Sequence, residues 1–298
     1  MLAHGAPAEH VSGPVTAVFV LLVAAAFLRW YVGASRSLGS WPQIRPAAAA
    51  GGVLAIVAAS IGPLPALAHE RFSAHMVQHL LLTHAAAPLL IASAPAVLLL
   101  RTSSPARRRR VSALLHAAWA RALVHPLVAW PFFAAVMWGT HFSPLYDAAL
   151  SNEALHGLEH ALYLGAALLF WAPVVALRPA TVRLSHPARL AYLLAALPTQ
   201  AFLGLALWSS ASVLYPHYLG SGRAAALSDQ RAGAVVMWVG GDLLMIAAAA
   251  LVAVGWMRHD DAEARRADRR LARGSESDEL IGRGGREEQS QVVDREAE

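Results

Sequence analysis

Seven apolar windows follow one another along this chain, and they constrain its fold more than any other feature. Each is about 20 residues long, the length of helix that crosses roughly 30 Å of bilayer hydrocarbon. The third contains Pro88 and Pro95 and is expected either to bend or to end early and continue along the membrane interface. The windows cover residues 15–33, 47–67, 73–100, 124–142, 154–177, 188–212 and 232–257. The sequence therefore predicts an all-α integral membrane protein, a bundle of seven transmembrane helices.

The composition supports this prediction and limits the chemistry of any site. Hydrophobic residues make up 57% of the chain and charged residues 14%, which is typical of a membrane protein. The chain has no cysteine, and this excludes disulfides, thiolate zinc sites, iron–sulfur clusters and thiol nucleophiles. Any metal ion must therefore be bound by His, Met or carboxylate ligands.

Arginine is divided unevenly between the two sides of the predicted bundle. The chain has no lysine, so all of its 24 basic residues are arginines. Of these, 21 fall in the connections between windows 1 and 2, 3 and 4, and 5 and 6, and in the C-terminal tail. Because basic residues accumulate on the cytoplasmic side, we predict an N-terminus outside the cell and a C-terminus in the cytoplasm. The run RRRR at 107–110 would then face anionic membrane lipid, so we expect no nucleic acid partner.

Residues 258–298 differ from the rest of the chain. They hold 9 arginines and 12 acidic residues, too polar a composition to bury a core. We predict a membrane domain over residues 1–257, followed by a charged cytoplasmic tail that is helical as far as Arg273 and largely disordered beyond it.

Two short motifs place histidine pairs inside apolar windows. HMVQH starts at residue 75 and HGLEH at residue 156, and in each the two histidines are four positions apart on one helix face. Both helices run inward from the predicted outer surface, so the pairs lie at similar depth. Neutral imidazole suits copper, zinc, iron or nickel. The motifs predict a metal site whose ligands are His75, His79, His156 and His160.

Three further residues are expected near these pairs. Gln78 and Glu159 share the faces of the histidines, where either can hold a ring N–H and Glu159 can also ligate the metal. His141 ends the fourth window at the same level and offers a fifth imidazole. Gln78 and Glu159 extend the predicted site on the two helices of the motifs, and His141 adds the helix of the fourth window.

Two aspartates near the seventh window have two interpretations each. Asp242 lies near the bilayer midplane, where a carboxyl group is either a functional relay or a protonated acid bonded to a backbone carbonyl. Asp229 either caps the N-terminus of the seventh helix or takes part in the site. The sequence leaves both alternatives open.

The HGLEH segment also matches the inverted zinc-peptidase motif, in which the glutamate is the general base. Such a site needs a third protein ligand and an open water position. No phosphate-binding glycine loop or serine triad is visible. Hydrolysis therefore stays a weaker hypothesis, with Glu159 as base.

Longer segments carry a family resemblance. FSAHMVQHLLLTHAAAPLLIASAP, WGTHFSPLYDAAL, LHGLEHALYLGAALLFWAPVV and DQRAGAVVMWVGGDL, in this order, resemble the multi-span CtaG family of cytochrome c oxidase (caa3-type) assembly factors. The family pattern points to His75, His79, His141, Tyr146, Asp147, His156, His160, Asp229, Trp238 and Asp242. The chain departs from it in lacking a second proline beside Pro88 and in having His84.

The resemblance implies a multi-pass protein of the bacterial inner membrane that helps copper reach heme-copper oxidase subunits at the outer face. We therefore expect an assembly factor with a histidine-rich copper site, not an enzyme. Two alternatives remain open. The chain could be a transmembrane b-type cytochrome, with one histidine from each motif binding heme, or a copper or proton transporter in which Asp242 is a relay.

Overall fold

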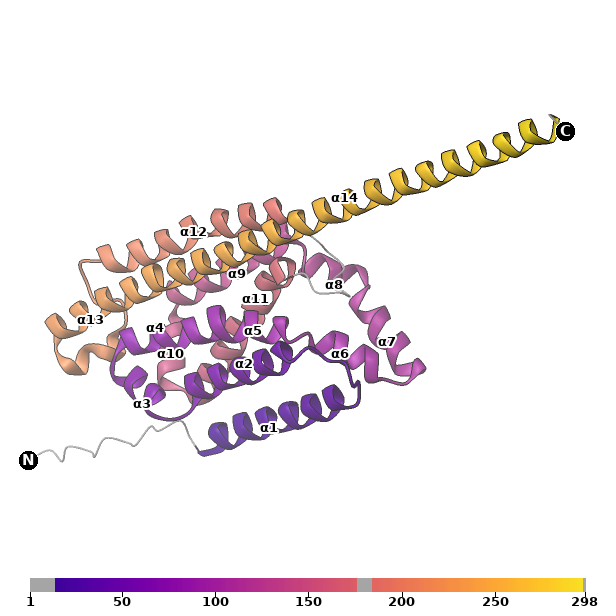
Figure 1. The fold of residues 1–298 in the computed structure, drawn as a ribbon. Coiled ribbons are helices and arrows are strands. Elements are labelled where there is room, and N and C mark those ends of the chain that lie inside the picture. Colours follow the sequence, from indigo (N-terminus) through magenta and orange to yellow (C-terminus); the bar gives the residue numbers. More distant parts are fainter. Residues whose placement is uncertain (1–13, 176–183, 297–298) are drawn as a thin grey trace, which may run out of the picture. The chain divides into compact units, whose positions relative to one another are not determined.

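The computed structural model describes residues 14–175 and 184–296 of the chain (Figure 1). Within these ranges the chain forms helices joined by turns, and no β-strand occurs among them. The predicted all-α fold is therefore confirmed. The segment before Pro14 and part of the connection between the fifth and sixth windows lie outside the described residues.

Proline opens many of the helices, at a position where its missing N–H has no partner within the helix. The first helices are α1 (Pro14–Arg36), α2 (Ile44–Ser60), α3 (Pro63–Glu70), α4 (Phe72–Leu80), the π-helical η1 (Leu81–Ala86), α5 (Ala87–Ala92), α6 (Pro95–Thr102), α7 (Pro105–Leu115) and α8 (Ala118–Leu123). They are followed by α9 (Pro126–His141), α10 (Pro144–Ser151), α11 (Glu153–Val175), α12 (His186–Ser209), the 3-10 helix η2 (Pro216–Ser221), α13 (Arg223–Val235), the π-helical η3 (Val236–Gly240) and α14 (Gly241–Glu296).

Several helices are long and apolar enough to cross a membrane, as expected for a multi-pass membrane protein. They are Val15–Arg36, Phe72–Thr102, Glu153–Val175, His186–Ser209 and Arg223–Arg266, joined by a sixth span if α2 and α3, bent by 45° at their junction, count as one. The fourth predicted window is not among them. Its helix α9 has only 16 residues, because it begins after His125 and the chain turns at Phe142. Seven spans therefore remain a prediction.

Two of the predicted windows are interrupted. Between α2 and α3, Gly62 has a φ of 97°, a backbone conformation that favours glycine. In the third window, Ala94 has a φ of 57° and Pro95 then opens α6. Pro88, in contrast, lies in the first turn of α5, directly after the π-helical turn η1. The expected bend is thus a break at Ala94.

The continuous segment α4–η1–α5 packs against α2, α11 and α13, and these helices lie around it in Figure 1. Contact with α13 depends on Gly233, because a Cβ at this position would lie 2.3 Å from Phe72 Cδ1. At the start of α14, a Cβ on Gly241 would lie 2.0 Å from Gln200 Nε2, so this glycine permits close approach of α12 and α14. The central position of α4 buries the face that carries its histidines.

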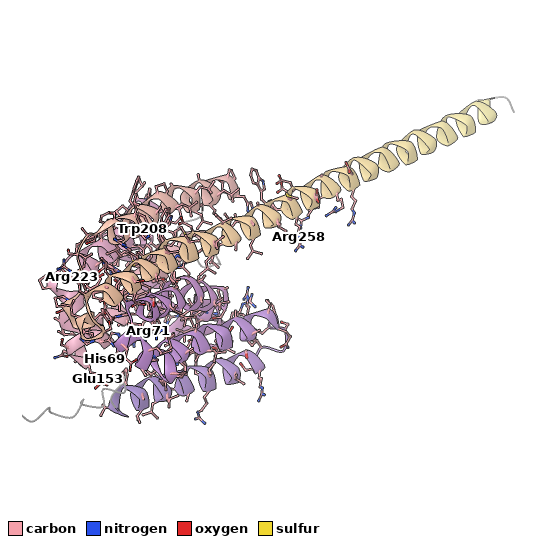
Figure 2. All side chains as sticks on the ribbon, turned by 90° about the vertical axis from the view of Figure 1, so that its left-hand side faces the viewer. His69, Arg71, Glu153, Trp208, Arg223 and Arg258 are labelled. Atoms are coloured by element: carbon pink, nitrogen blue, oxygen red, sulfur yellow. The ribbon has the colours of Figure 1, made fainter. Side chains whose placement is uncertain are left out.

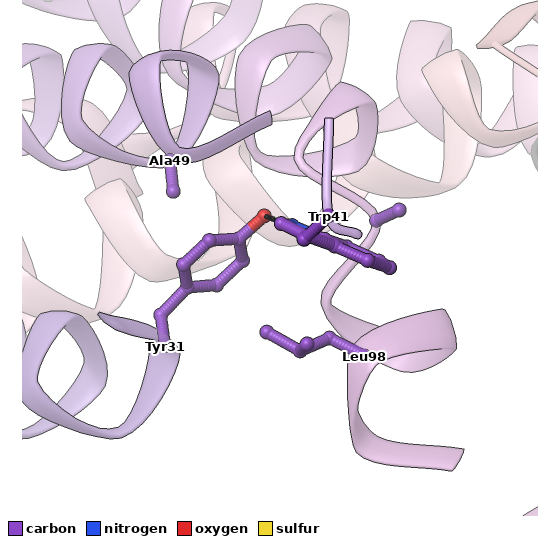
Figure 3. Close-up of a cluster of buried hydrophobic side chains, with 5 residues drawn as sticks. Tyr31, Trp41, Ala49 and Leu98 are labelled. Atoms are coloured by element: carbon purple, nitrogen blue, oxygen red, sulfur yellow. Dashed lines mark hydrogen bonds between the residues drawn. The ribbon is translucent and has the colours of Figure 1, made fainter. Parts of the chain in front are cut away.

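A separate buried cluster joins the end of α1 to the start of α2 and to α6 (Figure 3). We call it the Tyr31–Trp41 cluster, and it consists of Tyr31, Trp41, Ala49, Ala94 and Leu98. The Trp41 indole N–H donates to the Tyr31 hydroxyl at 3.1 Å, and that hydroxyl donates to the Ser93 carbonyl oxygen at 2.5 Å. The polar atoms of both aromatic side chains are therefore paired.

The last helix, α14, continues beyond Arg273, where the sequence predicts its end, to Glu296. The chain has no proline after Pro216, so nothing in this segment forces a helix to stop. An i,i+4 pair between His259 and Glu263, 3.2 Å apart, supports the helix. The chain divides into two units, Met1–Ala249 and Ala250–Glu298. A domain boundary at residue 257 remains a prediction.

Candidate metal centre

The five histidines predicted as ligands converge between α4, α9 and α11. His75 and His79 lie on α4, His156 and His160 on α11, and His141 ends α9. The ring centroids are 4.4 Å apart within the first pair and 4.2 Å apart within the second. Across the helices, the rings of His75 and His156 are 5.1 Å apart. The two motifs are therefore in contact, and we call these five residues the histidine cluster.

Two overlapping sets of donor atoms within the described residues have the spacing of a metal site. One set is His75, His79 and His160, the other is His75, His156 and Glu159, and within each set the ligand atoms lie within 4.8 Å of one another. Nitrogens on one tetrahedral ion, at about 2.0–2.1 Å each, lie roughly 3.3 Å apart. Small side-chain rotations would therefore bring three donors to a single ion.

The donor atoms of the cluster are buried and have no hydrogen-bond partner among the described residues. They are His75 Nε2, both ring nitrogens of His79, Nε2 of His141, His156 and His160, and both carboxylate oxygens of Glu159. Buried polar groups are nearly always paired, and an unpaired one costs about 1–3 kcal/mol. A cation bound by either donor set would satisfy three of these atoms, so the residues fit a metal ion.

Hydrogen bonds engage Nδ1 of two histidines and leave Nε2 without a partner among the described residues. His141 Nδ1 is 2.7 Å from the Met137 carbonyl oxygen, which can only accept, so Nδ1 carries the proton and Nε2 is free to ligate. His75 Nδ1 is 3.3 Å from the Tyr218 hydroxyl and 3.1 Å from the Tyr146 hydroxyl. In His75, too, Nε2 is therefore the ring nitrogen left for a ligand.

Tyrosines form the wall around the cluster. Tyr163 stacks on His79 with ring centroids 4.1 Å apart, and Tyr146 reaches His75 Nδ1 at 3.1 Å. Tyr215 donates to the His141 carbonyl oxygen at 3.2 Å. Burial raises the pKa of Tyr146 and of Tyr215 well above the ordinary value of a phenol. These tyrosines therefore remain neutral at physiological pH and act through hydrogen bonds.

Sequence reasoning missed two members of this wall, Tyr215 and Tyr218. Both come from the segment YPHYLGS, which forms η2 and its approach. The only signal was a pair of aromatic residues flanking His217 in a predicted outer connection. Burial also raises the pKa of Tyr218, so this phenol remains protonated as well.

Two predicted polar partners, Gln78 and Asp242, have contacts elsewhere. Gln78 is fully buried, but its amide donates to the Ala59 carbonyl oxygen of α2 at 2.5 Å and not to a histidine ring. Asp242 hydrogen-bonds to the Trp238 side chain. No contact among the described residues joins Asp242 to the histidine cluster. Of the polar partners predicted beside the histidines, only Glu159 lies at the cluster, with Oε2 3.8 Å from His75 Nε2.

Asp229 has a role that the sequence did not suggest. It lies inside α13, whose N-cap is Gly222, so the predicted cap of its own helix is wrong. Its carboxylate instead accepts from the Ser73 backbone N–H at 3.2 Å and from the Ser73 hydroxyl at 2.5 Å. Ser73 belongs to the first turn of α4, where backbone N–H groups lack intrahelical partners. Asp229 therefore caps α4, the helix that carries His75.

The remaining residues singled out by sequence also hold the structure around the site. Asp147 Oδ1 accepts from the His217 backbone N–H at 3.3 Å and so ties η2 to α10. His84, which departs from the family pattern, lies 2.8 Å from the Thr83 hydroxyl through Nδ1 and is not part of the cluster. Trp171 donates to the Thr83 carbonyl oxygen at 2.8 Å, which adds α11 to this contact.

Comparisons with known proteins identify the family to which this chain belongs. A family model described as cytochrome c oxidase caa3 assembly factor (Caa3_CtaG) matches residues 13–259. An uncharacterized protein of Mycobacterium bovis is 27% identical over 271 residues, which cover 87% of this chain and 41% of the relative. One of Mycobacterium leprae is 26% identical over 254 residues, 82% of this chain and 38% of the relative. The chain thus spans about two fifths of these relatives. No solved structure matches.

Proposed function

Because the chain belongs to the cytochrome c oxidase caa3 assembly factor family, we propose that it holds copper in the histidine cluster and passes it to the oxidase during assembly. One observation carries the proposal. Buried donor atoms of five histidines and Glu159 converge without hydrogen-bond partners among the described residues. Imidazole ligands suit copper, and a structural role would have paired these nitrogens.

The location of the cluster fits delivery at the outer face of the bacterial inner membrane. His75 and His156 lie in the first turns of α4 and α11, at the ends that the arginine distribution assigns to the outside. We propose that the chain has seven spans with an external N-terminus. Copper would then be handed to oxidase subunits on the side where the cluster lies.

A carrier needs ligands that hold an ion and then release it, and the cluster has this character. Two donor sets share His75, so an ion can move between them by keeping His75 and exchanging the other two ligands. Copper is here the cargo and not a resident cofactor. We accordingly propose a carrier and not an enzyme.

Ring contacts favour a metal ion over heme in this site. In a cytochrome with two histidine ligands the porphyrin lies between the imidazoles. Here the rings of His75 and His156 are 5.1 Å apart, and His79 stacks on Tyr163.

A transporter with Asp242 as relay gains less support, since no contact among the described residues joins Asp242 to the cluster. A zinc hydrolase would require Glu159 as base, and Glu159→Gln would abolish its activity.

The test is metal analysis and absorption spectroscopy of the purified protein, together with complementation of cells that lack the gene. We expect copper close to stoichiometric with protein and no Soret band. His79→Ala and His160→Ala should each lower both the bound copper and the oxidase activity of the cells. His84→Ala is the matched control, because His84 is buried but lies outside the cluster. Normal copper and normal oxidase activity in both cluster variants would exclude the proposed carrier.

A further inference from the structure

We infer that a surface cavity beside the histidine cluster captures copper before the ion reaches the cluster, and that His69 and His217 are its first ligands. This inference rests on the proposed function. The cavity, which we call the vestibule, has a volume of about 800 Å³ and lies between the end of α3, the helix η2 and α13. His69 and Arg71 on its wall are labelled in Figure 2.

The two histidines form a pair that is reachable from water. Their ring centroids are 4.5 Å apart, and both side chains are half-buried. His217 Nε2 is 2.9 Å from the His69 carbonyl oxygen, so this nitrogen carries the proton and Nδ1 keeps the lone pair. The Asp147 carboxylate holds the His217 backbone N–H. These contacts position the pair, and the lone pair of His217 Nδ1 is a donor that suits copper.

The vestibule adjoins the histidine cluster through the residues next to the pair. Tyr218 lines the vestibule, and its hydroxyl contacts His75 Nδ1 at 3.3 Å and the Ala68 carbonyl oxygen at 3.0 Å. Ala68 directly precedes His69 in the chain, and Tyr218 directly follows His217. Tyr218 is thus part of the wall between the captured ion and the first ligand of the cluster.

Charge and polarity also favour the vestibule over the other cavity as the entry route for copper. Glu70 and Asp229 line the vestibule, and their carboxylates attract a cation, although Arg71 offsets part of this charge. A second cavity of about 660 Å³ reaches His156 and His160, but side chains of α1, α2 and α11 make it largely apolar. A hydrated ion loses its water at high cost in such surroundings. The vestibule is therefore the route by which copper reaches the cluster.

The experiment times copper uptake by the purified full-length protein from a coloured Cu(I) chelator under anaerobic conditions. The variants are His69→Ala and His217→Ala, each expected to fill at least about tenfold more slowly than wild type, since a site that concentrates ions raises capture rates by 10-fold or more. The final copper content should equal that of wild type. His217→Gln keeps an amide that can donate to the His69 carbonyl oxygen, so it separates ligand loss from a distorted loop. His116→Ala, at the exposed C-cap histidine that follows α7 and lies outside both sites, is the control.

Each outcome is decisive for one of the two proposals. Slow filling of His217→Gln to a normal copper content supports the vestibule as a capture site. Filling at the wild-type rate in all the variants overturns it and leaves the cluster as the copper site. A reduced final content in His217→Ala and His217→Gln makes His217 a permanent ligand and also overturns the inference. A wild-type protein that takes up no copper overturns the proposed function itself.

Discussion

The histidine cluster and the Tyr31–Trp41 cluster are both buried and both contain polar side chains, but their polar atoms differ in one respect. In the Tyr31–Trp41 cluster, the indole N–H, the hydroxyl and the Ser93 carbonyl oxygen form a continuous hydrogen-bonded chain. In the histidine cluster, donor nitrogens from five rings and both oxygens of Glu159 lack a partner among the described residues. The first is a closed structural contact, whereas the second has the features of a ligand site.

Whether a buried polar group has a hydrogen-bond partner therefore helps to distinguish a structural role from a ligand-binding role. A paired group contributes modestly to stability, and its removal leaves its partner unsatisfied. An unpaired group lowers the stability of the metal-free protein, so its presence needs a ligand to explain it. Substitutions in the two clusters should therefore have opposite effects on stability and on copper binding.

The largest expected effect is that of His79→Leu in the histidine cluster. Leucine fills similar space but removes two buried nitrogens that have no partner among the described residues. We expect copper affinity to fall by more than about 100-fold, beyond the cost of losing a residue that only supports a ligand. The melting temperature of the metal-free protein should stay the same or rise, because unsatisfied polar atoms are removed.

Copper titration and thermal unfolding of the metal-free protein in detergent measure both effects of His79→Leu. The comparison between the clusters fails if this variant binds copper normally and melts at a clearly lower temperature. That result would make His79 a structural residue like Tyr31.

An intermediate effect is expected for Tyr31→Phe in the other cluster. The change leaves the Ser93 carbonyl oxygen and the Trp41 indole N–H without their partner, which should lower the free energy of unfolding by about 1–3 kcal/mol. Each kcal/mol corresponds to a fall in melting temperature of roughly 2–4 °C for a chain of this size. Copper affinity should equal that of wild type. A loss of copper in Tyr31→Phe without a loss of stability would reverse the assignment of the two clusters.

Much of the histidine cluster could be predicted from the sequence because its side chains are arranged by local rules. The i,i+4 spacing of each pair and the direction of each helix indicated that His75 and His156 lie at one level, and their rings are in contact. Helix spacing could not reveal which side chains turn to other neighbours. Gln78 shares a predicted face with His75 but binds the α2 backbone, a contact set by how closely two helices pack.

Contacts between distant segments were beyond such rules. Tyr218 lies 143 residues from His75, whose Nδ1 it contacts, and Asp229 lies 156 residues from the Ser73 that it caps. The apolar windows indicated where the chain crosses the membrane. They could not show that α9 has only 16 residues, because this length depends on where the chain turns. The prolines of the third window predicted a bend or an early end, but not that the helix breaks at Ala94. Hydropathy reports where a segment is apolar and not where its helix ends.

The smallest expected effect concerns the tyrosine wall and tests how far the histidine cluster depends on it. Tyr146→Phe removes one of two hydroxyls beside His75 Nδ1 and leaves Tyr218 in place. Because outer contacts of a metal ligand contribute about 10–100-fold to affinity, and one contact remains, we expect copper affinity to fall about tenfold. Tyr192→Phe is the matched control, since this buried phenol donates to the Phe170 carbonyl oxygen at 3.2 Å, away from the cluster. It should lower the melting temperature without changing copper affinity. Equal copper affinity in Tyr146→Phe and wild type would mean that Tyr218 alone orients His75. The effect of the tyrosine wall on copper affinity would then come from η2, which carries Tyr218.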